Sequence, residues 1–171
     1  METATGPVVS NASPLILLSG IGRFDLLESL FGSVLIAEEV RTEVATRGTD
    51  RPGAIEVTTA PWIRVGTIPG ASTVPRLSKT YGIGLGEAAT LALAKAVGAS
   101  MAIIDDRRGR AAAAALGIPV AGTVAVLELV HERGLLPDLR DTYLRIRSST
   151  GWIAPELLNA SLARFRLPTI Q

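Results

Sequence analysis

The feature that most constrains the fold of this 171-residue chain is a regular alternation of short apolar runs with helical patterns. The apolar runs have the length of strands, and the segments between them are long enough to carry helices. Strands separated by helices in this way predict βαβ crossovers and a buried parallel sheet. We therefore expect one α/β domain, with strands at 7–11, 33–37, 62–66 (an edge strand), 101–105 and 118–122.

The segments between these runs predict the helices. Residues 13–31 are expected to form one or two amphipathic helices, with Ser13 as the N-cap and Pro14 at the first helical position. Residues 67–84 are rich in Gly, Pro, Ser and Thr and predict a loop or a partly helical connector. Further helices are expected at 38–48, 85–99, 107–117, 123–134, 138–149 and 155–166. We expect a single domain over 1–171, with a core at about 7–135 and a C-terminal helical extension over 136–171.

The composition argues against several kinds of active site. The chain has no cysteine, which excludes thiol nucleophiles and cysteine-based zinc sites. Its one histidine, His131, lies in the last turn of an expected helix, where a structural role is favoured over a catalytic one. The net charge of +1 does not by itself predict a polyanionic partner. However, 15 of the 17 basic residues are arginine, the side chain that binds phosphate in a bidentate way.

Neither a targeting signal nor a membrane span is predicted. The N-terminal segment lacks the basic region of a secretory signal. The uncharged apolar run 111–127 is interrupted by Gly and Pro residues that predict a helix end and a loop. We therefore expect a soluble, cytoplasmic protein that does not bind a membrane.

Acidic and amide side chains follow the predicted strands at the edge where the carboxyl ends meet. Asn11 ends the first strand, and Asp105 and Asp106 follow the fourth. Glu43 lies one turn into the helix after the second strand, and Glu87 opens the helix before the fourth. Ligands of open parallel sheets bind outside the carboxyl ends of the strands. We therefore expect these side chains to converge on one pocket, close enough for the carboxylates to share a cation.

The oxygen atoms of these side chains suit Mg²⁺ or Mn²⁺ better than zinc. Carboxylate-held ions of this kind activate water and stabilise in-line displacement at phosphorus. Three arginines follow the paired aspartates and are placed to meet phosphate groups: Arg107, Arg108 and Arg110.

Local structure offers a second interpretation of the same side chains. Asn11 is of a residue type that often caps a turn or a helix, and one of Asp105 and Asp106 is expected to cap the helix that follows. Glu87 also suits the first turn of a helix without any ligand, and Glu43 suits an exposed helix face. The three arginines are equally compatible with a solvated helix face.

Three sequence blocks, taken together and in this order, are specific to one protein family. They are VVSNASPLILLSGIGRFDLLESLFGSVLIAEEVRTEV at 8–44, LGEAATLALAKAVGA at 85–99 and MAIIDDRRGRAAAAALGIPVAGTVAVL at 101–127. Together they resemble the PIN-domain proteins, and within them the poorly characterised branch related to VapC-type toxins. The resemblance implies a three-layer α/β/α sandwich on a parallel sheet of about five strands. It also implies a ribonuclease that cleaves RNA by means of water activated by Mg²⁺ or Mn²⁺. A toxin of a toxin–antitoxin pair would have a small antitoxin protein as a partner, and proteins of this family commonly form homodimers.

The resemblance assigns roles to individual positions. The catalytic acids of the family fall on Asn11, Glu43, Glu87 and Asp106, with Asp105 adjacent to the last. A small polar residue that often follows the fifth strand falls on Thr123, which we place with the three arginines as a candidate for substrate binding. At Asn11 the chain departs from the family, because an amide oxygen can ligate a metal but brings no charge. The alternative function is therefore a catalytically weak or inactive module that binds RNA or a protein partner.

Two other classes of α/β protein are disfavoured. A phosphoacceptor receiver domain also carries paired aspartates at a strand end, but it needs a lysine after its last strand, and the only lysines are Lys79 and Lys95. A dinucleotide-binding domain needs a glycine-rich turn after the first strand, and the sequence SNASPLI at 10–16 has no glycine there.

Overall fold

Five parallel strands form a single sheet in the computed structural model, which describes residues 6–46, 48, 50–149 and 153–170. The strand order is β3-β2-β1-β4-β5, and every neighbouring pair is parallel. Each strand lies within a predicted run, and β3 is at an edge as expected. The strands are β1 (Val8–Ser10), β2 (Val34–Ile36), β3 (Ile63–Val65), β4 (Met101–Ile103) and β5 (Val120–Ala121).

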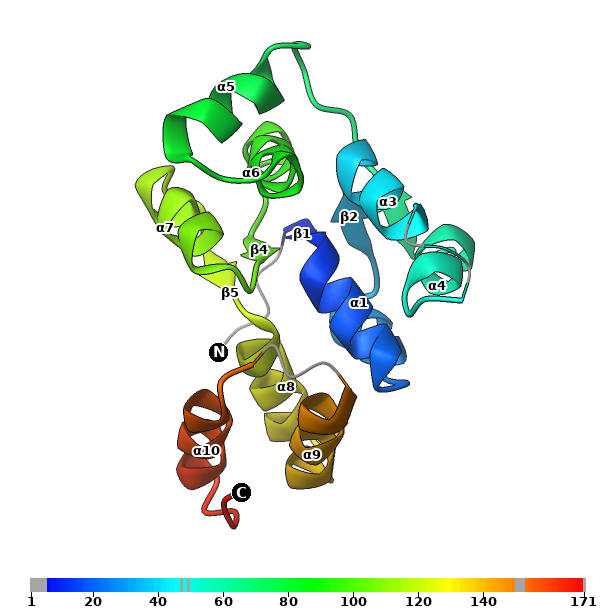
Figure 1. The fold of residues 1–171 in the computed structure, drawn as a ribbon, viewed down its shortest axis with the longest axis vertical. Helices are drawn as coiled ribbons and strands as arrows, with labels where there is room; N and C mark the ends of the chain where they lie inside the picture. Colours follow the sequence, from blue (N-terminus) through cyan, green and yellow to red (C-terminus); the bar gives the residue numbers. More distant parts are fainter. Residues whose placement is uncertain (1–5, 47, 49, 150–152, 171) are drawn as a thin grey trace.

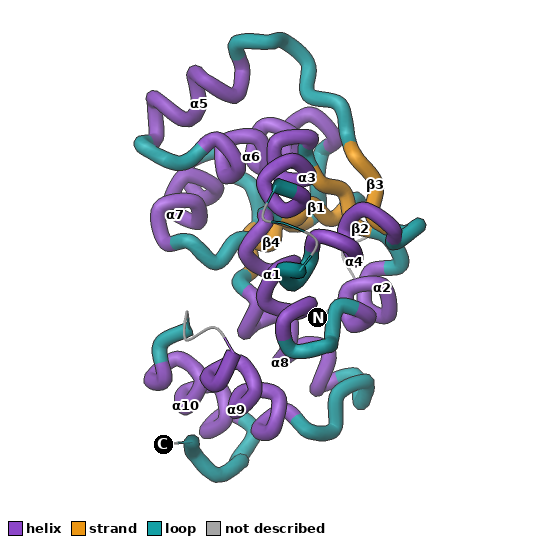
Figure 2. Tube along the Cα trace, turned by 45° about the vertical axis from the view of Figure 1, so that its right-hand side comes forward, coloured by secondary structure: helices purple, strands orange, loops and turns teal. Residues whose placement is uncertain are grey.

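Helices cover both faces of this sheet, which gives the expected three-layer α/β/α architecture (Figures 1 and 2). None of the described helices is long and apolar enough to cross a membrane. The described helices are α1 (Ala12–Gly20), α2 (Asp25–Phe31), α3 (Glu38–Ala45), α4 (Ala54–Thr59), α5 (Thr73–Tyr81), α6 (Leu85–Val97), α7 (Arg107–Ala115), α8 (Thr123–Glu132), α9 (Leu139–Ser149) and α10 (Pro155–Arg164).

Helix α1 is buried on nearly every side, so the expectation of an amphipathic helix is wrong for this element. Its residues from Pro14 to Ser19 are all buried, and Leu15 and Leu18 are fully inaccessible. The reason is tertiary packing, since α1 contacts α3, α4 and, from the C-terminal part of the chain, α9. The almost continuous apolar sequence of α1 is thus explained, because neighbouring helices pack against it on several sides.

The N-terminus of α1 also differs from the expectation. Asn11 is the N-cap, and its Oδ1 accepts a hydrogen bond from the backbone N–H of Ala12 at 2.8 Å. Ser13 and Pro14 therefore occupy the second and third helical positions. Proline is tolerated in this first turn because its missing N–H would have no partner within the helix.

Two helices lie in segments where the sequence signal was weak. Helix α5 occupies the middle of the Gly- and Pro-rich connector, which confirms a partly helical segment, and it packs mainly against α6. Helix α4 was not predicted, because its six residues, AIEVTT, are mostly β-branched and have low helix propensity. Its start is fixed by Glu56, whose Oε2 accepts a hydrogen bond from the N–H of Gly53 at 3.1 Å.

The C-terminal helices pack against α8 and α1 and are joined to α8 by polar contacts. Arg164 of α10 donates to Oε2 of Glu128, a carboxylate on α8 that is 9% exposed, at 2.5 Å. The hydroxyl groups of Tyr143 and Ser161 lie 2.7 Å apart between α9 and α10. His131 lies in the last turn of α8, where Nδ1 is hydrogen-bonded to the carbonyl of Leu136 at 2.5 Å, in keeping with a structural role.

Candidate active site

The strand order places the ends of β1 and β4 side by side at the switch point of the sheet. From β1 the chain runs to β2 on one side and returns later to β4 on the other. The backbone N–H of Asn11 donates to the carbonyl of Ile103 at 3.0 Å, so the two strands remain paired up to the point where β1 ends. Ligands of open parallel sheets bind at such a switch point.

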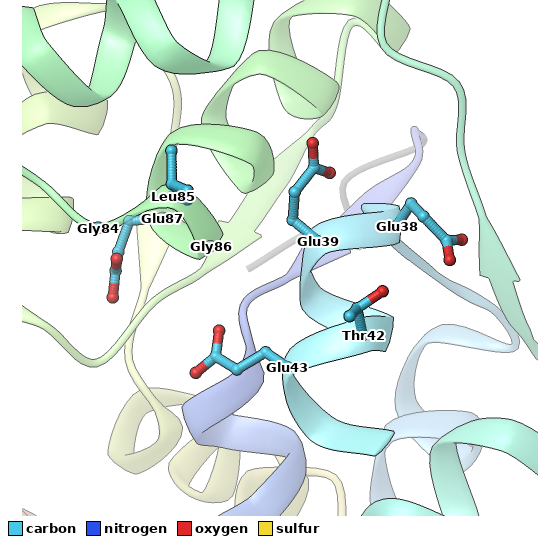
Figure 3. A pocket seen from close by; sticks show the side chains of 8 residues that line it. All are labelled: Glu38, Glu39, Thr42, Glu43, Gly84, Leu85, Gly86 and Glu87. Carbon is cyan, nitrogen blue, oxygen red and sulfur yellow. The ribbon is translucent and has the colours of Figure 1, made fainter. Parts of the chain in front are cut away.

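A pocket of about 630 Å³ lies between α3 and the start of α6. In Figure 3, the Glu43 side chain extends from α3 toward α6, whereas Glu38 points away from α6. Of the described residues that line this pocket, four are glutamates and none is basic, so the pocket suits a cation. The lining consists of Glu38, Glu39, Thr42, Glu43, Gly84, Leu85, Gly86 and Glu87.

Gly86 leaves the space that the Glu43 carboxylate occupies. A Cβ atom at position 86 would lie 2.6 Å from Oε2 of Glu43, closer than real Cβ atoms approach an oxygen. The same atom would lie 3.4 Å from Oδ1 of Asn11. Glu43 and Asn11 therefore both face the first turn of α6, although they come from different elements.

Asn11 connects the end of β1 with the acidic pocket. Its side chain is only 2% exposed, and both of its polar atoms are engaged. Oδ1 caps α1, as described above, and Nδ2 donates to Oε1 of Glu87 at 3.3 Å. An aspartate at this position could still cap the helix, but it would offer Glu87 a second negative charge in place of a donor. The amide thus satisfies one oxygen of the Glu87 carboxylate but leaves its charge in place.

Glu87 and Asp106 both lie near Gly109. A Cβ atom at position 109 would lie 3.3 Å from Cγ of Glu87 and 3.8 Å from Oδ1 of Asp106. Asp106 is the N-cap of α7, because its Oδ1 accepts a hydrogen bond from the N–H of Gly109 at 2.8 Å. This confirms that one of the two aspartates caps the helix. Glu87, in the first turn of α6, also complements the dipole of its own helix.

Asp105 points in a different direction from its neighbour. Its Oδ1 accepts from the backbone N–H of Thr123 at 2.7 Å, and its Oδ2 accepts from the Thr123 hydroxyl at 2.6 Å. Thr123 is fully buried. The structure therefore places this threonine against Asp105, away from where a substrate could reach it.

Comparison with known protein families shows what kind of fold carries this pocket. A family model described as a PIN domain matches residues 7–166. The chain belongs to the PIN-domain family. The match includes the expected core and both C-terminal helices, α9 and α10. No curated protein and no solved structure matched the chain. PIN domains are in general metal-dependent nucleases, and divalent metals are their typical cofactors.

The donor atoms of this PIN domain fit a hard divalent cation in their chemistry. All of them are oxygen atoms, as Mg²⁺ and Mn²⁺ prefer, and the glycines at 86 and 109 leave the carboxylates room to approach. Among the described residues, however, no three Asp, Glu, His or Cys side chains lie close enough to hold a metal ion. The expectation that the carboxylates already converge closely enough to share a cation is therefore wrong for this structure. The Asn11 amide engages Glu87, the helix cap engages Asp106, and like charges repel each other.

The three arginines after the paired aspartates have different surroundings. Arg107 and Arg108 are exposed at the start of α7, and no carboxylate among the described residues forms an ion pair with them. Arg110 is half-buried, and its Nη1 donates a hydrogen bond to the backbone carbonyl of Asp105. Only the first two arginines are thus free to contact a phosphate group without losing a partner.

Two acids of the pocket were missed by the sequence analysis. Glu38 and Glu39 line it together with Glu43. Glu39 and Glu43 are four residues apart on α3 and hence on one helix face, a spacing that was visible in the sequence. Glu38 is less suited to bind a cation, because hydrogen bonds from the Arg41 guanidinium already engage its carboxylate. The same hydrogen bonds lower its pKa.

Proposed function

We propose that this PIN domain is a metal-dependent endoribonuclease whose active site is the pocket between α3 and α6. The observation that carries the proposal is the acidic pocket beside the switch point of a PIN-domain sheet, where Asn11 and Glu43 face the first turn of α6 and Asn11 donates to Glu87. When bound, Mg²⁺ or Mn²⁺ would activate water and stabilise in-line displacement at phosphorus.

Different side chains would bind the cation and the substrate. Glu43, Glu87 and Asp106 would hold the cation, and Asp106 has a second oxygen, Oδ2, that caps no helix. Asn11 keeps Glu87 turned toward the end of β1 through its amide. The exposed cations of Arg107 and Arg108 would bind the phosphates on either side of the bond that is cleaved.

The toxin assignment is supported only by the resemblance of the three sequence blocks to the branch related to VapC-type toxins. On that basis we propose that the RNA-cleaving chain is held inactive by a small antitoxin protein and that it forms a homodimer. Expression alone should then arrest the growth of a bacterial host, and co-expression of the neighbouring small reading frame should restore it. Light scattering would measure the oligomeric state.

A second function, a catalytically weak or inactive module that binds RNA or a protein, is favoured by one observation. The buried Asn11 amide satisfies Glu87 without a cation, so the pocket can remain stable when no metal is bound. Binding of RNA without cleavage would support this function.

Single-turnover cleavage of a mixed RNA pool separates the two functions. We expect cleavage in Mn²⁺, none in EDTA, and a loss of at least about a hundredfold in rate for Glu87→Gln. Glu156→Gln is the matched control, since Glu156 is an exposed acid in the first turn of α10 and does not line the pocket. RNA that binds with equal affinity in Mn²⁺ and EDTA but is never cleaved would contradict the nuclease function.

A further inference from the structure

The two adjacent aspartates after β4 differ in every contact that they make. Asp106 is exposed and uses one carboxylate oxygen to cap α7, which leaves Oδ2 without a hydrogen bond to the described residues. Asp105 is half-buried and uses both carboxylate oxygens on a single partner, Thr123. The two adjacent side chains therefore contact different helices: Asp106 contacts α7, and Asp105 contacts α8.

Further contacts hold Asp105 in this orientation. The Arg110 guanidinium binds its backbone carbonyl, and the N–H of the preceding residue, Ile104, pairs with the carbonyl of Ala121 in β5 at 2.9 Å. Gly122 leaves room for the carboxylate, because a Cβ atom there would lie 3.1 Å from Oδ1 of Asp105. The end of β4 is thus tied to the start of α8 on one side and to the first turn of α7 on the other.

Releasing Asp105 to bind a metal ion would be costly. The Thr123 hydroxyl is fully buried and would lose Asp105 as its acceptor, as would the backbone N–H of the first residue of α8. A buried donor without a partner destabilises the native state. Oδ2 of Asp106 can bind a cation without any such loss.

We propose that Asp105 is a positioning residue: its two hydrogen bonds to Thr123 fix the β4–α7 junction so that Asp106, and not Asp105, presents a carboxylate to the cation beside Glu87. The part of this inference that concerns the cation rests on the proposed function. The part that concerns the position of Asp106 does not. It assigns the two aspartates of the DD pair to different tasks, and it gives Thr123 the task of orienting Asp105.

Isosteric substitutions distinguish the two aspartates. In Asp105→Asn, the amide can keep both hydrogen bonds, since Oδ1 still accepts from the Thr123 N–H and Nδ2 can donate to the Thr123 hydroxyl. We expect Mn²⁺ affinity, measured by titration calorimetry, to stay within about threefold of the wild type for this variant. Asp106→Asn removes a charge from the cation site and should weaken Mn²⁺ binding by at least about tenfold. An equal loss in both variants would overturn the proposal.

Thr123 supplies a test that needs neither metal nor activity. Thr123→Val removes the hydroxyl while keeping the shape, and Thr123→Ser restores the donor. The amide of Gly109, which donates to Asp106, reports by hydrogen exchange whether Asp106 remains in place. We expect faster exchange of this amide in Thr123→Val and a return toward the wild-type rate in Thr123→Ser, with Mn²⁺ affinity reduced by about tenfold in the valine variant only.

The outcomes separate this proposal from the proposed function. If the wild type binds no Mn²⁺, the nuclease function fails, whereas Gly109 exchange in Thr123→Val still decides whether the Asp105–Thr123 pair positions Asp106. Unchanged exchange in that variant would overturn the positioning role even if the enzyme cleaves RNA. If Thr123→Val does not fold, Asp105→Ala takes its place, because it removes the same hydrogen bonds by changing the less buried partner. Faster exchange of the Gly109 amide is again expected, and unchanged exchange would again contradict the proposal.

Discussion

The amide of Asn11 donates a hydrogen bond to Oε1 of Glu87 at 3.3 Å, and this contact joins the end of β1 to the first turn of α6. It occurs at the position where the resemblance of the sequence to PIN-domain proteins implies an aspartate, and an ionised aspartate could not donate to Glu87. The contact satisfies one oxygen of the Glu87 carboxylate within the protein, and it leads to the first prediction.

Asn11→Asp should make the stability of the protein depend more strongly on metal. The aspartate keeps the cap of α1 but places a buried charge beside Glu87, so we expect a loss of about 1–3 kcal/mol of stability in EDTA. Mn²⁺ should restore this stability and bind more tightly than to the wild type. Thermal melts of both proteins in EDTA and in Mn²⁺ measure the effect. An equal response to Mn²⁺ in the two proteins would show that position 11 does not face the cation.

The wild type should itself be stabilised by a divalent cation. A ligand present at a hundred times its Kd adds about 2.7 kcal/mol to the stability of the native state. For a domain of this size, this corresponds to a rise in Tm of roughly 5–10 °C. Melts at neutral pH in EDTA, Mg²⁺ and Mn²⁺ test this, with Ca²⁺ as a further oxygen-binding ion for comparison. Identical midpoints in EDTA and in millimolar Mn²⁺ would count against a metal site in this pocket.

Gly86→Ala should separate stability from metal binding. The added Cβ would lie 2.6 Å from Oε2 of Glu43 and must displace this carboxylate, so Mn²⁺ affinity should fall by about tenfold. Alanine favours a helix over glycine by up to about 1 kcal/mol, so the stability in EDTA should be unchanged or higher. Gly20→Ala, at the end of α1, is the control, because its nearest neighbour would lie 3.7 Å away in ordinary contact. Weaker metal binding in both variants would point to a general effect of the substitution.

The sequence was sufficient to predict the sheet and most helices, because the apolar runs and helix signals agree with the tertiary structure. It failed for α1, whose burial is set by contacts with α3, α4 and also α9, which lies more than a hundred residues away in the sequence. Asn11 and Asp106 could each be assigned to a cap or to a pocket from sequence patterns. The structure shows that both are helix caps, and it places Asn11 in contact with Glu87, which lines the pocket. The pairing of Asp105 with Thr123 had no local signal, because it joins the ends of two neighbouring strands.

The C-terminal helices should respond to alkaline pH through Tyr143. Burial raises the pKa of its hydroxyl to about 12, with a further contribution from the nearby Glu128. The pKa in the unfolded chain is about 10. The native state therefore holds this proton more tightly, so the stabilisation is complete below about pH 10 and is lost as the pH rises toward 12. Urea unfolding of the wild type and Tyr143→Phe on both sides of pH 10 tests this.

The phenylalanine variant should show a flatter decline in that window. It should also be less stable at neutral pH by about 1 kcal/mol, because the buried Ser161 hydroxyl loses its partner. Ser161→Ala in the same background is the control that removes the unpaired hydroxyl. If the two curves have the same slope above pH 10, Tyr143 does not titrate differently in the native and unfolded states.

The central claim is that Glu43, Glu87 and Asp106 hold one divalent cation that serves RNA cleavage. Its most direct test is the single-turnover rate of cleavage of one RNA in Mn²⁺ by the wild type, Asp106→Asn and Asn11→Asp. We predict a loss of at least about a hundredfold for Asp106→Asn, because a positioned metal contact contributes several kcal/mol to the transition state. The rate for Asn11→Asp should equal or exceed that of the wild type. Three indistinguishable rates, or no cleavage above a metal-free blank by any of the proteins, would contradict the claim.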